Sequence, residues 1–286
     1  SSDLIDLDIK GFFDNIDHDL MMLAVKRFTS EKCILMYVER WLKAPVILLD
    51  GTLKESNGRG TPQGGVISPL LANIFLHFAF DLWMGKHFPD NVFERYADDI
   101  IIHCNRFKEA NRVLKAVGKR LEECKLSLHP IKTKIVYCYN NQKRQVPMKL
   151  VNKSFDFLGY TFKPRIVKAR GILCIGFSPG ISKKSQKRIN EVFFKLKIHR
   201  WTHLTIDKIA DFLKAQTRGW INYYGKFRKT ELRNVFRCLN FRLAHWVRNR
   251  YRRFWKRPRS YAYNWLVNVS KAFPSLFVHW EHGFLP

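Results

Sequence analysis

Residues 91–103 read NVFERYADDIIIH, with the adjacent carboxylates of Asp98 and Asp99 between two short strand-like runs. Apolar and β-branched residues dominate both runs, so the stretch predicts a β-hairpin. A tight hairpin turn normally uses Asn-Gly or Asp-Gly, and two like charges side by side repel each other. A divalent cation held at the turn would neutralise both carboxylates and would explain this sequence.

A second acidic strand end lies 90 residues before Asp98, where residues 4–9 read LIDLDI. Strand alternation puts the apolar residues of this run on one face and Asp6 and Asp8 on the other. If Asp8 lies beside Asp98 and Asp99, the three carboxylates form an all-oxygen site for a hard cation such as Mg²⁺. In a strongly basic chain, such a site indicates phosphoryl transfer on a nucleic acid.

The order of the expected elements brings these acidic residues together. Strand patterns at 3–10, 92–96, 99–104 and 133–139 alternate with helical patterns at 18–42, 68–87 and 106–124. This is the split β-α-β-β-α-β order, in which the first strand lies beside the central hairpin. We therefore predict an α+β fold: an antiparallel sheet with helices on one face, followed by an all-α basic domain. The later elements are expected at 155–163 and 172–177 (strands) and at 182–199, 205–222 and 231–254 (helices).

The net charge of +27 on the 286-residue chain is unevenly distributed. Residues 1–180 carry 27 Lys and Arg against 19 Asp and Glu, whereas residues 181–286 carry 24 against 5, a net of +19. A segment this basic repels itself unless it meets a polyanion. No apolar run approaches the roughly 20 residues that span a bilayer, so nucleic acid is favoured over a membrane. We place the domain boundary at 180/181.

Aromatic residues interleave with the basic ones at 246–257, which read WVRNRYRRFWKR. Arg248, Arg252 and Arg253 are the candidate phosphate-binding residues of this stretch. The six cysteines are scattered without a Cys-x-x-Cys pair, which argues against zinc and is typical of reduced thiols in an intracellular protein.

A glycine-rich loop at 60–69, GTPQGGVISP, lies between the two acidic elements and leads into a helix. Its glycines allow close backbone approach to a ligand, and a helix N-terminus favours phosphate. Taken in order, the motifs resemble those of reverse transcriptases encoded by group II introns. The resemblance rests on 8–18 (DIKGFFDNIDH), 60–69, 96–99 (YADD), 126–134 (LSLHPIKTK), 155–160 (FDFLGY) and 218–225 (RGWINYYG).

The resemblance implies an RNA-directed DNA polymerase with a palm domain at 1–180 and a basic thumb or maturase domain at 181–286. Asp8, Asp98 and Asp99 would hold two Mg²⁺ ions, for which Mn²⁺ could substitute. Lys132 would donate a proton to pyrophosphate or neutralise its charge, with Lys134 as the alternative. The other acidic residues near the first motif are expected to cap the helix near residue 18 or to face solvent; they are Asp6, Asp14, Asp17 and Asp19.

Substrate contacts are also implied by the resemblance. Phe13 would be a steric gate that clashes with a ribose 2′-hydroxyl, or else a core residue. Pro62, Gln63 and Gly64 would contact the incoming nucleotide and the template base, or else form a purely structural turn.

The implied partners are intron RNA, an RNA template, a DNA primer and dNTPs, with no membrane. The expected compartment is the cytoplasm of a bacterium, with an organelle as the alternative. Only seven residues precede Asp8, so the fingers region of the family is missing, and activity of this chain alone is an open question. A separate chain carrying the fingers is one further partner. The C-terminus shows no Cys/His-rich endonuclease module, as in family members that lack the endonuclease.

Two other functions stay open. A non-catalytic RNA-binding maturase would need the basic domain but not the acidic cleft. A domesticated or retron-like reverse transcriptase would keep the palm, although the 218–225 signature weighs against it.

Overall fold

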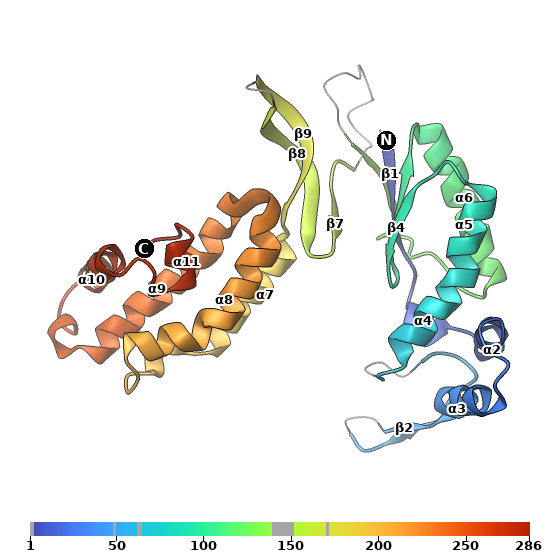
Figure 1. Cartoon of the computed structure of the whole chain (residues 1–286), viewed down its shortest axis with the longest axis horizontal. Coiled ribbons are helices and arrows are strands. Elements are labelled where there is room, and N and C mark those ends of the chain that lie inside the picture. The colour runs from blue at the N-terminus through green and yellow to red at the C-terminus, as the bar shows by residue number, and fades with distance from the viewer. Residues whose placement is uncertain (1–2, 48–49, 62–64, 139–151, 170–171) are drawn as a thin grey trace. The chain divides into compact units, whose positions relative to one another are not determined.

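The structure is a computed structural model that describes residues 3–47, 50–61, 65–138, 152–169 and 172–286 (Figure 1). Contacts divide the chain into two compact units: Ser1–Phe155 with Ile166–Ile175, and Asp156–Arg165 with Gly176–Pro286. This division runs through a β-hairpin, whereas the boundary expected at 180/181 follows that hairpin. Assignment of residues 1–180 and 181–286 to separate functions stays a prediction.

A four-stranded antiparallel sheet is the centre of the first unit. Its order is β4-β5-β1-β6, formed by β1 (Asp3–Asp8), β4 (Phe93–Tyr96), β5 (Asp99–Cys104) and β6 (Lys134–Tyr137). The central hairpin β4–β5 thus lies beside the first strand, and the split β-α-β-β-α-β topology is confirmed. Ile5, Leu7 and Ile102 are buried between the sheet and the helices.

The helices of this unit lie on one side of the sheet in Figure 1, where α4, α5 and α6 are labelled. The expected helix at 18–42 is two helices, because the chain leaves the helical conformation at 27–31, which read RFTSE. The expected helix at 68–87 contains a π-helical segment, η1, and a short hairpin at 46–54 was not expected. The elements are α1 (Phe12–Asn15), α2 (His18–Lys26), α3 (Lys32–Lys43), β2 (Val46–Ile47), β3 (Leu53–Lys54), α4 (Ser68–Leu76), η1 (His77–Asp81), α5 (Leu82–His87) and α6 (Phe107–Glu123).

The prediction of one strand at 155–163 is wrong in one respect, because a turn at Leu158 and Gly159 divides this segment into two strands. Both residues have positive φ, 49° and 80°, so the chain reverses there. The result is a three-stranded sheet of β7 (Phe155–Phe157), β8 (Tyr160–Ala169) and β9 (Ile172–Ile181). A Cβ at Gly159 would lie 2.9 Å from the Ser185 hydroxyl, which explains why glycine occupies this position.

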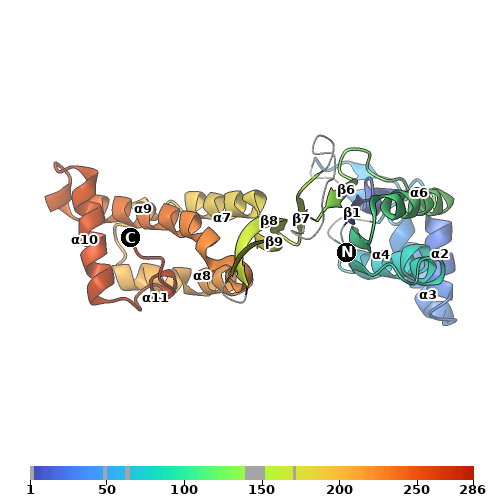
Figure 2. The ribbon, with the colours of Figure 1, turned by 90° about the horizontal axis from the view of Figure 1, so that it is seen from above.

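The second unit has its own helical core, in which Phe193, Phe236, Trp246 and Trp280 are fully buried. In Figure 2, α10 lies across the far end of α9, and α7 and α9 are in contact with each other. The helix expected at 231–254 ends at Arg250, and the two helices that follow were not expected. The elements are α7 (Lys183–Lys195), η2 (Ile198–Arg200), α8 (Ile206–Arg228), η3 (Lys229–Leu232), α9 (Arg233–Arg250), η4 (Arg252–Phe254), α10 (Arg259–Ala272) and α11 (Val278–Glu281).

Across the described ranges, no helix has the length and apolar character needed to cross a bilayer.

Candidate active site

The strand register brings the two acidic motifs to one end of the sheet. β1 ends at Asp8, β5 begins at Asp99, and these two residues pair directly across the antiparallel ladder. Directly opposed residues project their side chains from the same face. Asp98 belongs to the two-residue turn Ala97-Asp98, because Tyr96 and Asp99 form the last pair of the hairpin. The three acidic residues that the sequence separates by 90 positions are therefore neighbours.

Hydrogen bonds from the segment before β6 fix the backbone of Asp8. Its carbonyl accepts from the His129 amide (2.8 Å) and from the Thr133 hydroxyl (3.1 Å), and its own amide lies 3.3 Å from that hydroxyl. The Lys132 ammonium lies 3.2 and 3.4 Å from the two Asp8 carboxylate oxygens. Lys134 instead lies 3.5 Å from Asp6. Of the two lysines considered, Lys132 is the one that reaches Asp8.

The donor set at this end of the sheet fits a hard cation. Carboxylate oxygens of Asp8, Asp98 and Asp99 are the ligands that Mg²⁺ and Mn²⁺ take. In the part of the chain that the structure describes, no three His, Cys, Asp or Glu side chains converge on one ion-sized site. The sheet register thus places suitable carboxylates at adjacent positions without converging them on one ion-sized site, and the Lys132 ammonium lies against the first of them.

The turn that carries Asp98 has a strained backbone, and a hydrogen bond from Arg95 holds it in place. Ala97 has φ of 53°, a left-handed conformation that costs a non-glycine residue on the order of 1–3 kcal/mol. Arg95 donates one hydrogen bond to the Ala97 carbonyl (3.2 Å) and grips Asp81 through two more (2.7 and 2.5 Å). The same guanidinium donates to the Asn73 side-chain oxygen at 2.8 Å. These contacts tie the Asp98 turn to the end of the π-helical segment η1, and π-helical segments often occur at functional sites.

Sequence reasoning missed this arginine clamp. A signal for it was present, because residues 74–84, IFLHFAFDLWM, place a single carboxylate, Asp81, in an apolar helix. A carboxylate in such a setting needs a cationic partner. The side chains of Asp81 and Arg95 are only 21% and 12% exposed. The sequence does not show which arginine would meet this need.

Phe13 lies where the glycine-rich loop meets the end of β1. It belongs to α1, beside the buried Phe12, with the two rings edge to face at 5.4 Å. Its carbonyl accepts a hydrogen bond from the Thr61 amide at 2.7 Å, so the start of the loop is held against it. Gly60 has φ of 85°, and a Cβ there would lie 3.0 Å from the Asp14 carbonyl. Phe13 is half-buried, which fits both a gate and a core residue.

Pro62, Gln63 and Gly64, the predicted contacts to nucleotide and template, lie outside the described residues. Their roles stay predictions.

Asp17 has the capping role that the sequence predicts. Its carboxylate accepts from the Leu20 amide at the start of α2 (3.1 Å) and pairs with the Lys125 ammonium (2.6 Å). Burial alone would raise the pKa of Asp17, but the bonds from Lys125 and the Leu20 amide outweigh it and lower the pKa. Asp17 therefore has a structural role, as the cap of α2 and the partner of Lys125.

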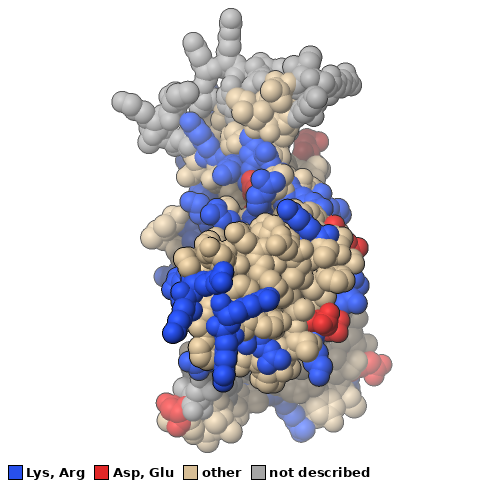
Figure 3. All heavy atoms as spheres, turned by 90° about the vertical axis from the view of Figure 1, so that its left-hand side faces the viewer, with Lys and Arg blue, Asp and Glu red and all other residues tan. Residues whose placement is uncertain are grey.

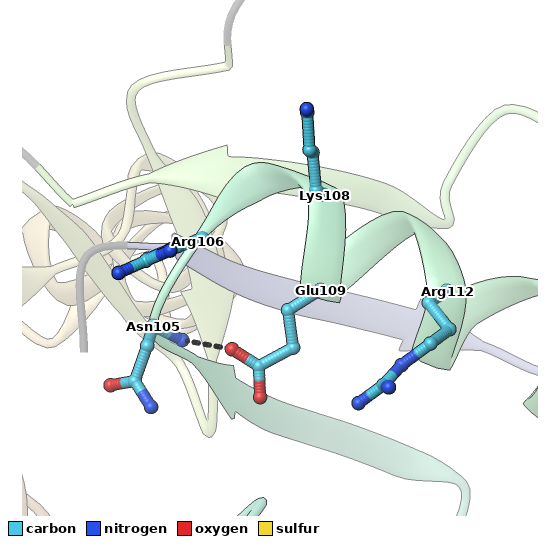
Figure 4. A pocket seen from close by; sticks show the side chains of 5 residues that line it. All are labelled: Asn105, Arg106, Lys108, Glu109 and Arg112. Atoms are coloured by element: carbon cyan, nitrogen blue, oxygen red, sulfur yellow. Dashed lines mark hydrogen bonds between the residues drawn. The ribbon is translucent and has the colours of Figure 1, made fainter.

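A cavity of about 610 Å³ in the first unit lies away from these carboxylates (Figure 4). It is formed at the start of α6, where the Glu109 carboxylate accepts from the Asn105 amide at 2.9 Å. That hydrogen bond and one from Asn91 lower the pKa of Glu109. Because β5 runs from Asp99 to Cys104, this cavity is at the opposite end of the strand from the acidic site. This hollow is therefore not the place that the carboxylates indicate.

The candidate phosphate-binding arginines cluster around the turn η4 of the second unit. Arg248 is half-buried in the last turn of α9 and lies 3.3 Å from the Trp255 carbonyl. The guanidinium of Arg252 lies 6.0 Å from the Trp255 ring centre, and that of Arg253 lies 4.8 Å from the Phe254 ring. Figure 3 views this unit from the side of α10 and shows Lys and Arg side chains bordering an uncharged area.

Two family models match the chain. Residues 2–162, more than half of its length, match the family described as reverse transcriptase (RNA-dependent DNA polymerase). Residues 186–263 match the maturase-specific domain of group II introns. The first match includes the acidic site and β7, and the second covers most of α7 through the start of α10.

Two individual relatives are proteins associated with introns. The group II intron-encoded protein LtrA of Lactococcus lactis is 30% identical over 142 residues, which is 49% of this chain and 22% of LtrA. The putative COX1/OXI3 intron 1 protein of Saccharomyces cerevisiae is 30% identical over 162 residues, 54% of this chain and 18% of that protein. The chain spans about a fifth of the length of these two relatives.

Among solved structures, the chain is similar to apo telomerase from Candida tropicalis, with a TM-score of 0.46 and 10% identity. The match covers 99% of this chain and 51% of the telomerase chain. A likeness at this score adds nothing to the fold derived above.

Proposed function

The chain belongs to the reverse transcriptase (RNA-dependent DNA polymerase) family, and on this premise we propose that it synthesises DNA on an RNA template at the Asp8, Asp98 and Asp99 site. The observation that carries the proposal is the strand register, which sets Asp8 opposite Asp99 with Asp98 in the adjoining turn. Like charges directly opposed across a ladder destabilise a sheet. A catalytic role for the carboxylates would explain why the chain keeps this destabilising pair.

Each side chain of the site has a distinct role in this proposal. Asp8, Asp98 and Asp99 hold divalent cations, Mg²⁺ in the first place and Mn²⁺ as a substitute. When bound, such ions activate the primer 3′-hydroxyl and stabilise the charge of the leaving pyrophosphate. Lys132, whose ammonium already contacts Asp8, neutralises the pyrophosphate or gives it a proton. Phe13 excludes the ribose 2′-hydroxyl, and Gln63 with its neighbours Pro62 and Gly64 contacts the nucleotide and the template base.

The second unit is proposed to hold RNA. It carries most of the net positive charge, and it contains the match to the maturase-specific domain of group II introns. A polyanion is the partner that such a charge requires. We propose intron RNA together with an RNA template and a DNA primer as the ligands, dNTPs as substrates and a bacterial cytoplasm as the setting.

A second function, assistance to the folding of intron RNA, is favoured by the same maturase match. It needs only the second unit and can coexist with polymerisation. A chain with this function alone would gain nothing from the opposed carboxylates of the first unit.

Primer extension on an RNA template tests the polymerase proposal. The chain alone, and the chain joined to the corresponding preceding region of LtrA, are each given an annealed DNA primer, dNTPs and Mg²⁺. Extension that stops when Asp98 is replaced by asparagine supports the proposal. If neither protein extends the primer while both bind the RNA, the non-catalytic function is correct.

Phe13→Val is expected to increase the incorporation of ribonucleotides. If the ring contacts the 2′ position, shortening it should reduce the preference for dNTPs over rNTPs roughly 10- to 100-fold. Single-nucleotide insertion kinetics with dGTP and GTP measure the ratio. Phe78→Val is the control, because Phe78 is also half-buried in the first unit but packs on Phe28. An unchanged ratio in Phe13→Val would mean that this ring is only a core residue.

Replacing Arg248, Arg252 and Arg253 with glutamine is expected to weaken RNA binding and its salt dependence. Six phosphate contacts give a slope of roughly −4 to −5 in log K against log salt, and three lost contacts flatten it by roughly two to three units. Affinities for one RNA at several KCl concentrations measure the slope.

A charge-matched control removes three exposed cations of α7: Lys183, Lys184 and Arg188. If the variant that lacks Arg248, Arg252 and Arg253 gives a plot of log K against log salt parallel to that of the wild type, these arginines do not contact phosphate. Equal flattening in both variants would show that only the net charge matters.

A further inference from the structure

α9 and α10 enclose a cavity of about 520 Å³ that combines aromatic and cationic side chains. Its volume falls within the range of small-ligand pockets, about 300–1,000 Å³. The lining residues that carry the argument are Phe241, His245, Arg248, Arg259, Tyr263 and Asn264.

Phe241 lies on this surface without being needed by the core. It is 52% exposed, while its helix neighbours Leu239 and Leu243 fill the core of the unit. Its ring centre lies 5.2 Å from that of Tyr263 with 35° between the planes, and the Arg237 guanidinium lies 5.5 Å from it. Exposed rings beside guanidinium groups are the features on which proteins stack the bases of single strands.

The charges around the cavity are of one sign. Arg248 and Arg259 line it, and no carboxylate is among its lining residues. His245 is stacked on His199 with 5.0 Å between ring centres. Burial, then His199 and the nearby arginines, lower the pKa of His245, so its imidazole is neutral at pH 7 and offers hydrogen bonds instead of charge.

The binding surface continues along α9. A second hollow of about 510 Å³ shares Phe241 and His245 with the first and adds Arg237 and Arg242. Aromatic surface therefore lies between guanidinium groups on both sides. The order of cation, ring and cation is the one that a strand needs when phosphates flank a base.

We propose that this cavity binds an unpaired nucleotide of single-stranded RNA, with the base against Phe241 and Tyr263 and the adjoining phosphates at Arg248 and Arg259. A duplex would present phosphates alone and leave the rings uncovered. A protein segment would leave the guanidinium groups without counter-charge unless it were acidic as well as apolar. The inference rests on the proposed function, in which this unit holds RNA, and it names the part of the RNA that is recognised here.

The test measures equilibrium binding of the full chain to two RNAs of equal length, one unstructured and one fully paired. Phe241→Ala is expected to weaken binding to the unstructured RNA roughly five- to 100-fold and to leave duplex binding and the salt slope unchanged. Phe241→Trp, which keeps a stacking face, should bind like the wild type, and Phe241→Leu should bind like the alanine variant. Thermal unfolding of each variant checks that the unit stays folded.

Phe212→Ala is the matched control, because Phe212 is 58% exposed and packs edge-on to Trp201 at 5.0 Å, outside both hollows. An RNA with abasic nucleotides should bind the wild type as weakly as intact RNA binds Phe241→Ala. Equal losses for single-stranded and paired RNA, an equal loss in the control, or no loss at all would each overturn the proposal. Binding is measured without dNTPs, so the result is independent of whether the chain extends a primer.

Discussion

Asp8→Asn and Asp98→Asn are each expected to abolish primer extension. Either change removes a carboxylate from the set that holds the catalytic ions, and with it several kcal/mol of charge stabilisation in the transition state. A loss of roughly 4 kcal/mol is about a 1,000-fold decrease in rate. Single-turnover extension with saturating dNTPs measures the decrease. Asp90→Asn, which neutralises an exposed turn carboxylate of the same unit, should extend like the wild type.

Asp8→Asn should leave the protein folded and able to bind RNA. A carboxylate contributes nothing to holding a polyanion, so RNA affinity should stay within about twofold. Asp8 and Asp99 are opposed across the ladder, and removal of one charge relieves a repulsion of roughly 0.2–1 kcal/mol. The lost contact with Lys132 stabilises little, because that lysine is 61% exposed.

Asp8→Asn should therefore be inactive and at least as stable as the wild type in urea unfolding. An inactive variant that is also strongly destabilised would indicate that Asp8 is structural. Extension at a tenth of the wild-type rate or more would contradict its role as a metal ligand.

The topology of the first unit could be predicted from the sequence because two local patterns coincide there. Alternation in β1 and the paired runs around Asp98 define strands, and their order with the intervening helices admits the split β-α-β-β-α-β arrangement. This was enough to place Asp8 beside Asp98 and Asp99. Family resemblance was needed to give Phe13 and Gln63 roles.

The errors in the prediction arise where tertiary contacts override local pattern. Leu158 reads as a strand residue, yet it takes positive φ in a turn to which the Tyr223 hydroxyl donates a hydrogen bond at 2.8 Å. The helix after residue 231 ends at Arg250, because the next residues pack Phe254 into the core. Gly159 was a signal for the turn, since an isolated glycine in a strand pattern suggests a bulge or a close backbone approach, whereas the end of the helix at Arg250 depends on tertiary packing.

The arginine clamp was missed for a different reason: the sequence signals that Asp81 needs a cationic partner but does not show which residue supplies it. The clamp joins Asn73, Asp81, Arg95 and Ala97, which lie on two helical segments and a hairpin. Only the folded chain shows that one guanidinium serves all of these contacts. Because this guanidinium holds the turn that carries Asp98, Arg95 is a positioning residue in the proposed reaction.

Arg95→Lys is expected to lower kcat about 100-fold, the scale of loss that a displacement of roughly 1 Å at a reacting group can cause. Lysine keeps the charge but cannot make the two-pronged contact with Asp81 and also reach the Ala97 carbonyl. The strained turn would then be free to relax, and Asp98 with it. KM for dNTPs should change little, because no contact with the nucleotide is removed.

The metal dependence of the reaction separates positioning from general loss of structure. If Arg95 acts through Asp98, Arg95→Lys should raise the Mg²⁺ concentration that gives half-maximal extension. The control is Arg120→Lys, since Arg120 donates to the Ala79 carbonyl of the same π-helical segment (3.0 Å), and the hydrogen bonds that the structure describes for it do not include the turn. That variant should lose a similar amount of stability and keep the wild-type Mg²⁺ dependence. Identical Mg²⁺ curves for Arg95→Lys and the wild type would show that the clamp supports the fold alone.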